Sequence, residues 1–226
     1  MARHSNAATI GAGAASVKKT AYERFQQELL AGRLRPGQVV SQRELVQTLG
    51  LSIGALRELL PRLEAEGLLN VMPQRGIQIT TIDLPMIRDA YQMRMAFERE
   101  AALFAVDRMP DAIIEEQRRL HVESLERLKS DRSQAFFEES QDVDSRFHEL
   151  LVDFTQNELL IQAYDLNSIR VRLIKLDRIT LSATTLPAAF GDHLAIIEAI
   201  LERDRWKAAA AMETHIRNAR ERALAI

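Results

Sequence analysis

The chain has 226 residues, enough for two modest domains, and it contains no cysteine. Disulfides, iron–sulfur clusters and thiol nucleophiles are therefore excluded, and a bound metal would need histidine, carboxylate or backbone-oxygen ligands. The formal net charge of −2 hides an asymmetry, because residues 1–82 carry 10 basic and 6 acidic side chains whereas residues 83–226 carry 20 and 26. A basic first third suits an anionic partner.

Residues 1–17 are small and polar, which predicts a disordered tail. They lack the continuous apolar core of a secretory signal peptide, and no later stretch approaches the roughly 18 consecutive apolar residues that span a membrane. We therefore expect a cytoplasmic protein with no membrane partner.

Residues 18–82 show the order of elements expected for a winged helix-turn-helix domain. Ser41 and Glu44 form a capping box that begins a short helix, Gly50 supplies a tight turn, and Ser52 can cap the next helix. The predicted helices span residues 18–31, 41–50 and 52–66. Two segments, 68–72 and 77–81, then flank the turn 73–76 as a hairpin wing.

The run from Leu30 to Ile79 resembles the winged-helix domain of GntR-type transcriptional regulators. The matching parts are G-x-L-x-P-G from Gly32, S-x-R-E-L from Ser41, Leu56-Arg57-Glu58, L-E-A-E-G-L from Leu63, and the Arg75-Gly76 wing tip. The resemblance covers residues 18–81. It implies a homodimer that binds double-stranded DNA at a pseudo-palindromic operator.

The same resemblance assigns DNA contacts to named residues. Arg43 and Arg57 would contact phosphates or base edges, and Gly76, beside Arg75, would let the wing tip approach the DNA backbone or minor groove. The chemistry of the residues agrees, since guanidinium groups suit guanine edges and phosphates, and the helix end at Ser52 presents backbone amides to phosphate.

Two positions depart from the family pattern. Ile53 and Gly54 stand where members usually carry arginine and threonine, which removes a guanine-contacting side chain and a hydroxyl. Pro61 lies inside the predicted recognition helix, where it lacks an amide for the carbonyl of Arg57, so we expect a kink or a loosened turn. Burial of Ile53 by a partner helix is the structural alternative. We expect DNA binding with an unusual operator or reduced affinity.

Residues 83–226 are predicted to be helical almost throughout, which makes the protein mainly α with a C-terminal antiparallel bundle. The expected helices span residues 83–108, 110–130, 134–154, 157–181, 188–202 and 204–224. Asn157 is placed to cap the fourth of them.

Three histidines and one aspartate lie on faces of these helices that are otherwise apolar: Asp144, His148, His193 and His215. Asp144 and His148 are one turn apart, so their side chains leave the same face. His121 has charged neighbours and is predicted to be solvated. Burying an unpaired polar group costs about 1–3 kcal/mol, so four such groups in one core need a shared partner. A divalent transition metal, zinc or nickel, has the matching ligand preference.

Residues 83–226 also resemble the FCD-type ligand-binding domain of the FadR-like branch of GntR regulators. The matching segments are Asp144–His148, Asn157–Leu160, Asp192–Ile200 and Met212–His215. The resemblance implies that Asp144, His148, His193 and His215 coordinate a metal together, and that a small carboxylate effector binds beside it.

Arginines are the candidates for holding that carboxylate. Arg94 occupies the arginine position of the family's R-x-x-x-E pattern, and an inward guanidinium could hold a carboxylate through two hydrogen bonds. A surface ion pair between Arg94 and Glu98 is the alternative. Arg170 and Arg172 are weaker candidates, because their helix must expose some of its basic residues.

The sequence therefore predicts a metabolite-responsive DNA-binding transcriptional regulator, a repressor in preference to an activator, and not an enzyme. A metal-dependent enzyme that acts on a small carboxylate is one alternative, but no H-E-x-x-H or nucleophile-elbow motif is present. A regulator with an apolar acyl-ligand pocket is the other, and the four ligand-type residues argue against it.

Overall fold

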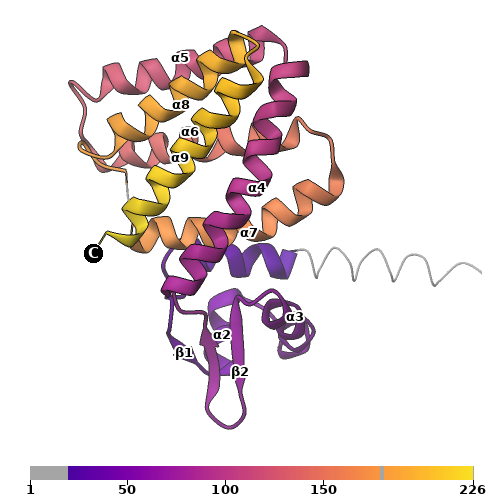
Figure 1. The fold of residues 1–226 in the computed structure, drawn as a ribbon. Helices are drawn as coiled ribbons and strands as arrows, with labels where there is room; N and C mark the ends of the chain where they lie inside the picture. The colour runs from indigo at the N-terminus through magenta and orange to yellow at the C-terminus, as the bar shows by residue number, and fades with distance from the viewer. Residues whose placement is uncertain (1–19, 179–180, 226) are drawn as a thin grey trace, which may run out of the picture. The chain divides into compact units, whose positions relative to one another are not determined.

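The computed structural model describes residues 20–178 and 181–225, and the predicted tail lies outside them. The chain divides into two compact units, Met1–Ile82 and Asp83–Ile226 (Figure 1). The fold is mainly helical, as predicted, with a small antiparallel sheet in the first unit and a helical bundle in the second. Within the described residues, no helix combines the length and apolar character needed to cross a membrane.

The first unit is a winged helix-turn-helix. A helix over residues 20–30 precedes the elements β1 (Val39–Val40), α2 (Gln42–Leu49), α3 (Ile53–Ala65), β2 (Leu69–Met72) and β3 (Gly76–Ile79). The antiparallel sheet has the order β1-β3-β2, with Val40 opposite Ile77 and Leu69 opposite Ile79. Strand β1 was not expected from the sequence, because its two residues are too short a run to show a strand pattern.

Local signals set the helix boundaries in this unit. The capping box is present, because the Glu44 amide donates to Ser41 Oγ at 3.1 Å and the Ser41 amide donates to Glu44 Oε2 at 2.7 Å. Ser52 caps α3 by accepting from the Ala55 amide at 3.2 Å. Gly50 ends α2 with φ 60°, the left-handed conformation that glycine adopts readily. These three predictions are confirmed.

The recognition helix α3 contains Pro61 in its interior. It continues through Pro61 from Ile53 to Ala65, so the expected loosening does not end it. Pro61 is exposed, which places the unpaired carbonyl of Arg57 on the surface of the helix. Ile53 is 46% exposed, so no helix of the described chain buries it.

Gly76 has a structural role at the start of β3. Its φ is 113°, and a Cβ added there would lie 2.8 Å from the Val40 backbone oxygen of β1. The wing turn itself is residues 73–75, with Gln74 in the left-handed region at φ 62°. Glycine at position 76 therefore allows β1 to approach β3. This structural role does not depend on a contact between the wing and DNA.

Replacing Gly76 by alanine should lower the free energy of unfolding by about 2 kcal/mol or more, because strain at positive φ and a backbone clash add together. Urea denaturation of the full chain measures the change. The matched control is Gly54→Ala in α3, where the added Cβ meets Ser52 Oγ at 3.9 Å and helix propensity improves by about 1 kcal/mol. Equal stability of both variants would contradict the packing argument.

The second unit is a bundle of six helices within the described residues. They are α4 (Leu84–Arg108), α5 (Asp111–Arg127), α6 (Gln134–Asp153), α7 (Glu158–Arg178), α8 (Leu186–Leu201) and α9 (Arg205–Leu224). Asn157 caps α7 as predicted, accepting from the Leu160 amide at 3.2 Å. Helix α8 begins at Leu186, two residues earlier than expected, because Pro187 is tolerated in a first turn.

Alanines let the central helices of the bundle approach closely. Helix α4 packs most extensively against α9, and α8 also packs extensively against α9. The buried alanines of the α4–α9 pair are Ala90, Ala101, Ala102 and Ala105 on α4, and Ala208, Ala209, Ala219 and Ala223 on α9. The buried face of α6 carries Asp144 and His148 between Phe147 and Leu151. The bundle thus places polar side chains at its centre.

Candidate metal centre

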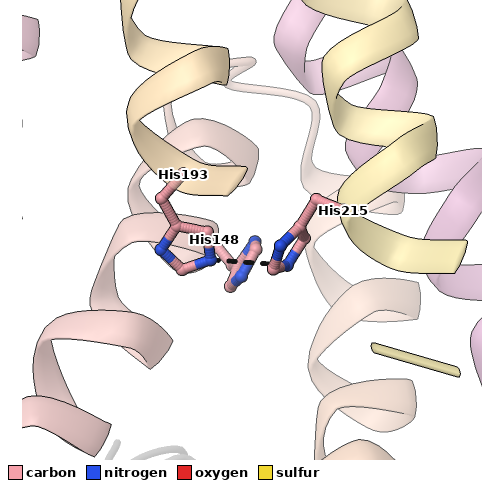
Figure 2. Close-up of side chains that lie close together, drawn as sticks. All are labelled: His148, His193 and His215. Carbon is pink, nitrogen blue, oxygen red and sulfur yellow. Dashed lines mark hydrogen bonds between the residues drawn. The ribbon is translucent and has the colours of Figure 1, made fainter. Parts of the chain in front are cut away.

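The histidines of three different helices meet inside the bundle. His148 of α6, His193 of α8 and His215 of α9 are all buried, and one nitrogen from each lies within 4.8 Å of the others. Figure 2 shows the three imidazole rings pointing toward one another. The Nε2 atoms of His193 and His215 are 3.3 Å apart. The structure therefore brings together three of the four predicted ligands directly.

Asp144, the fourth predicted ligand, lies beside this group. It is buried one turn before His148 on α6, and its Oδ1 is 3.7 Å from His193 Nε2. Its other oxygen, Oδ2, accepts from Gln141 Nε2 at 3.1 Å and pairs with Lys175 Nζ. One carboxylate oxygen is thus held away from the histidines, while the other remains directed at them.

His121 is buried, so the prediction that it is solvated is wrong. The ring is 0% exposed, and its Nε2 lies 2.9 Å from His193 Nδ1. Its Nδ1 lies 2.7 Å from the Gln117 carbonyl oxygen, which can only accept, so Nδ1 carries the proton. A neutral His121 then accepts at Nε2 from the Nδ1–H of His193. This chain of two hydrogen bonds leaves a lone pair on His193 Nε2.

A carboxylate lies next to the Nδ1 atom of each of the other two histidines. His148 Nδ1 lies 2.8 Å from Glu98 Oε2, and His215 Nδ1 lies 3.7 Å from Asp192 Oδ2, although neither contact is an aligned hydrogen bond. Asp192 is held by the Asn218 amide at 3.0 Å. A carboxylate next to Nδ1 favours the proton on that nitrogen and leaves Nε2 as the lone-pair atom.

Arg94 shows which way those lone pairs point. Its Nη2 lies 2.7 Å from His148 Nε2 and 3.4 Å from His215 Nε2. A guanidinium can only donate, so both Nε2 atoms accept. Arg94 also donates to Glu98 Oε1 at 2.6 Å, and both side chains are buried. The alternative of a surface Arg94–Glu98 pair is therefore wrong, because the pair is internal and contacts two of the histidines.

Burial keeps these imidazoles neutral. It lowers the pKa of His148, His193 and His121, and it lowers the pKa of His215 to about 4. Burial alone would raise the pKa of Asp144, but the Lys175 ammonium, together with other nearby positive charge such as Arg94, outweighs it and holds that pKa well below its usual range. The centre thus offers neutral nitrogens and one ionised carboxylate, the protonation states in which these groups bind a metal.

The spacing of the His193 and His215 nitrogens suits two ligands of one ion. Two nitrogens bound at about 2.1 Å lie about 3.0 Å apart at a right angle and about 3.4 Å apart at a tetrahedral angle. The separation of 3.3 Å between His193 and His215 falls in this range. Two lone pairs that face each other across 3.3 Å repel, and a shared cation would relieve that repulsion.

Comparison with known proteins identifies the family. A model of the FCD domain matches residues 89–218, more than half of the chain, and the model of the gntR family of bacterial regulatory proteins matches residues 17–79. The chain belongs to the GntR family. Its FCD domain places it in the FadR-like branch, which confirms the resemblance noted in the sequence.

Relatives extend over most of this GntR regulator. The transcriptional repressor RspR of Escherichia coli K12 is 26% identical over 91% of this chain and 88% of its own length. A GntR regulator structure from Rhodococcus sp. RHA1 has a TM-score of 0.70 at 16% identity, covering 93% of this chain and 98% of that one. The metal-free FCD domain of TM0439 has a TM-score of 0.51 at 23% identity, covering 64% and 95%. The two structures support the fold alone.

The family match establishes the broad function. The chain is a DNA-binding transcriptional regulator, with DNA binding assigned to its winged helix-turn-helix. The curated relatives are transcriptional regulators and not enzymes, in agreement with the prediction from the sequence.

The predicted DNA contacts lie on the surface of the first unit. Arg43 on α2, Ser52 at the start of α3, Arg57 on α3 and Arg75 in the wing turn are exposed, whereas Gly76 is half-buried in β3. Arg43, Arg57 and Arg75 have no ion-pair partner among the described residues, so their guanidinium groups are available to phosphates or bases.

Two cavities of the FCD domain share walls with the histidine cluster. One is lined by Tyr91, Asp144, His215 and Arg222, among others. The second is lined by Glu98, His148, Glu149 and Arg172, among others. Arg94 and Lys175 line both. Most of these side chains are charged or polar, and an acyl chain would need aliphatic walls instead.

The other two arginines that were predicted to bind the effector, Arg170 and Arg172, differ in their positions. Arg172 lines the second cavity and pairs with Glu149. Arg170, on the same helix, lines neither of the two cavities, and its Nη1 donates to the Leu166 carbonyl at 3.3 Å. The sequence did not single out Lys175, although a lysine one helix away from an inward aspartate is a natural counter-charge.

Proposed function

We propose that this regulator is a repressor whose FCD domain binds a divalent transition metal, zinc or nickel, and a small organic acid beside it. Asp144, His148, His193 and His215 would hold the metal. The observation that supports this most strongly is the set of three buried histidine nitrogens within 4.8 Å of one another, on rings whose other nitrogen lies against a polar group. Outer partners of this kind orient histidines that ligate metals.

The position of Arg94 supports the proposed binding of an organic acid beside the metal. Its guanidinium donates to His148 Nε2, the atom that the metal would need. A bound cation would repel Arg94 Nη2, so the guanidinium would turn away from the histidines toward the adjoining cavities. There it would be available to a carboxylate through two parallel hydrogen bonds. Arg172 lies further along the second cavity and is a secondary candidate.

In DNA binding, the proposed form is a homodimer on a pseudo-palindromic operator, one winged helix for each half-site. Arg43, Ser52, Arg57 and Arg75 would make the contacts to phosphates and bases. The acid acts as a switch only if its affinity for the free regulator differs from its affinity for the DNA-bound regulator.

A thermal-shift screen of organic acids tests the proposal on tag-free, metal-loaded protein, with and without chelator. A ligand raises the melting temperature by mass action, and an acid that binds through the metal loses that effect once the metal is removed. Anisotropy titrations with labelled operator then measure DNA release. If no acid stabilises the metal-loaded protein, the effector part of the proposal is wrong.

Replacing Arg57 by alanine should weaken binding to an in vitro-selected operator by about 1–3 kcal/mol, because an exposed guanidinium on the recognition helix is lost. Fluorescence anisotropy measures the affinity at fixed salt concentration. The matched control is Arg33→Ala, since Arg33 is exposed in the same unit but paired with Glu28. Equal losses in both variants would indicate a general charge effect rather than a contact by Arg57.

A further inference from the structure

The cavity beside His215 contains buried polar atoms without partners. Tyr91 Oη and Arg94 Nη1 are fully enclosed, and neither makes a hydrogen bond within the described residues. Both side chains stand on α4, three residues apart, and line the same wall of the cavity. An enclosed donor is stable only when something accepts from it, so an occupant of this cavity should carry acceptor oxygens.

A third donor reaches the cavity from α9. Arg222 follows His215 by two helical turns, on the same face of the helix, with Ala219 between them. Long side chains on a helix point back toward its N-terminus, which directs the Arg222 guanidinium toward His215. Arg222 has no hydrogen bond or ion pair within the described residues. The small side chains Ala189 and Ala219 leave the space between these groups open.

Charge distinguishes this cavity from the second one. Its walls hold three cations, Arg94, Lys175 and Arg222, against one carboxylate, Asp144. In the second cavity Glu98 and Glu149 face Arg94, Lys175 and Arg172, and Arg172 is already paired with Glu149. The greater excess of positive over negative side chains therefore lies in the cavity lined by His215 and Asp144.

We propose that this cavity selects an acid with two anionic groups: one group binds beside Asp144 and His215 together with Arg94, and the second binds between Tyr91 Oη and Arg222. This inference rests on the proposed metal- and acid-binding function and narrows it to the class of short dicarboxylates and acids of like charge. Tyr91 and Arg222 are then the residues that determine specificity.

Isothermal titration of the nickel-loaded full chain tests the inference with matched pairs of acids. The diacids are malonate, succinate and glutarate, and each is compared with the monocarboxylate of equal chain length: propionate, butyrate and valerate. At least one diacid should bind about tenfold or more tightly than its partner, since a second charge-assisted contact is added. Arg222→Met should abolish that preference by weakening the diacid more than the monocarboxylate, and Tyr91→Phe should reduce it.

The matched control is Arg220→Met, because Arg220 is exposed two residues earlier on α9 and does not line the cavity. It should keep the full preference. Diacids that bind no more tightly than monocarboxylates would overturn the inference while the proposed function stands. A preference that survives Arg222→Met would also overturn it. If nickel is bound but no acid of either kind binds, both this inference and the acid-binding part of the proposed function are wrong.

Discussion

Zinc or nickel should raise the melting temperature of the wild-type chain by about 8–16 °C at a thousandfold excess over its dissociation constant. The reason is mass action, since such an excess adds about 4 kcal/mol to the folded state, and a domain of this size gains about 2–4 °C for each kcal/mol. His193→Ala and Asp144→Asn should each remove most of this shift, because each deletes a ligand from a buried four-ligand centre.

For each variant, the quantity compared is the difference in melting temperature between the metal-loaded and metal-free protein, and not the absolute melting temperature. His193→Ala removes a hydrogen bond to His121, and Asp144→Asn leaves Lys175 without its counter-charge, so both metal-free variants should unfold at lower temperatures. Asp142→Asn is the matched control, since Asp142 is exposed on the same helix, two residues from Asp144. A full shift in His193→Ala or Asp144→Asn would place the metal elsewhere.

Helical periodicity singled out the candidate ligands because each is a polar residue on an otherwise apolar face. His193 shares its face with Ile196, Ile197 and Ile200, so its direction follows from the sequence alone. The helix boundaries followed in the same way from Ser41, Ser52 and Asn157, whose side chains cap the helices that follow them.

His121 shows where this reasoning fails. Its near neighbours in the sequence are charged, yet Ile114, Gln117, Leu125 and Leu128 recur with it at intervals of three and four residues on the covered side of α5. Helix α5 is polar on most of its circumference. The sequence signal of its narrow buried stripe is therefore weaker than that of its charged surface residues. Arg94 was ambiguous for a related reason, because spacing alone cannot separate a buried ion pair from an exposed one.

His121→Phe should lower the metal affinity of the regulator by about 10- to 100-fold, the range seen when the outer partner of a metal-ligating histidine is removed. Phenylalanine fits the site, because the His121 ring already packs against Phe147 and Phe190 at centroid distances of 5.2 and 4.6 Å. What is lost is the acceptor for the Nδ1 proton of His193. Competition against a zinc-binding dye measures the affinity.

His121→Gln provides the rescue. A glutamine amide oxygen reaches about as far as imidazole Nε2 and can accept the same hydrogen bond, so it should recover part of the lost affinity. Nitrogen NMR of the metal-free proteins gives a second readout that a change in packing alone would not produce. The proton of His193 should sit on Nδ1 in the wild type and in His121→Gln, and it should be free to move to Nε2 in His121→Phe.

Metal affinity and the position of the His193 proton should change together, because His121 is proposed to act by holding that proton on Nδ1. With the proton on Nε2, His193 must release it before it can bind a cation, and that requirement lowers metal affinity without any change in the fold. If His121→Phe binds zinc as tightly as the wild type, the hydrogen bond does not position His193. If its affinity falls while the His193 proton stays on Nδ1, packing is responsible instead.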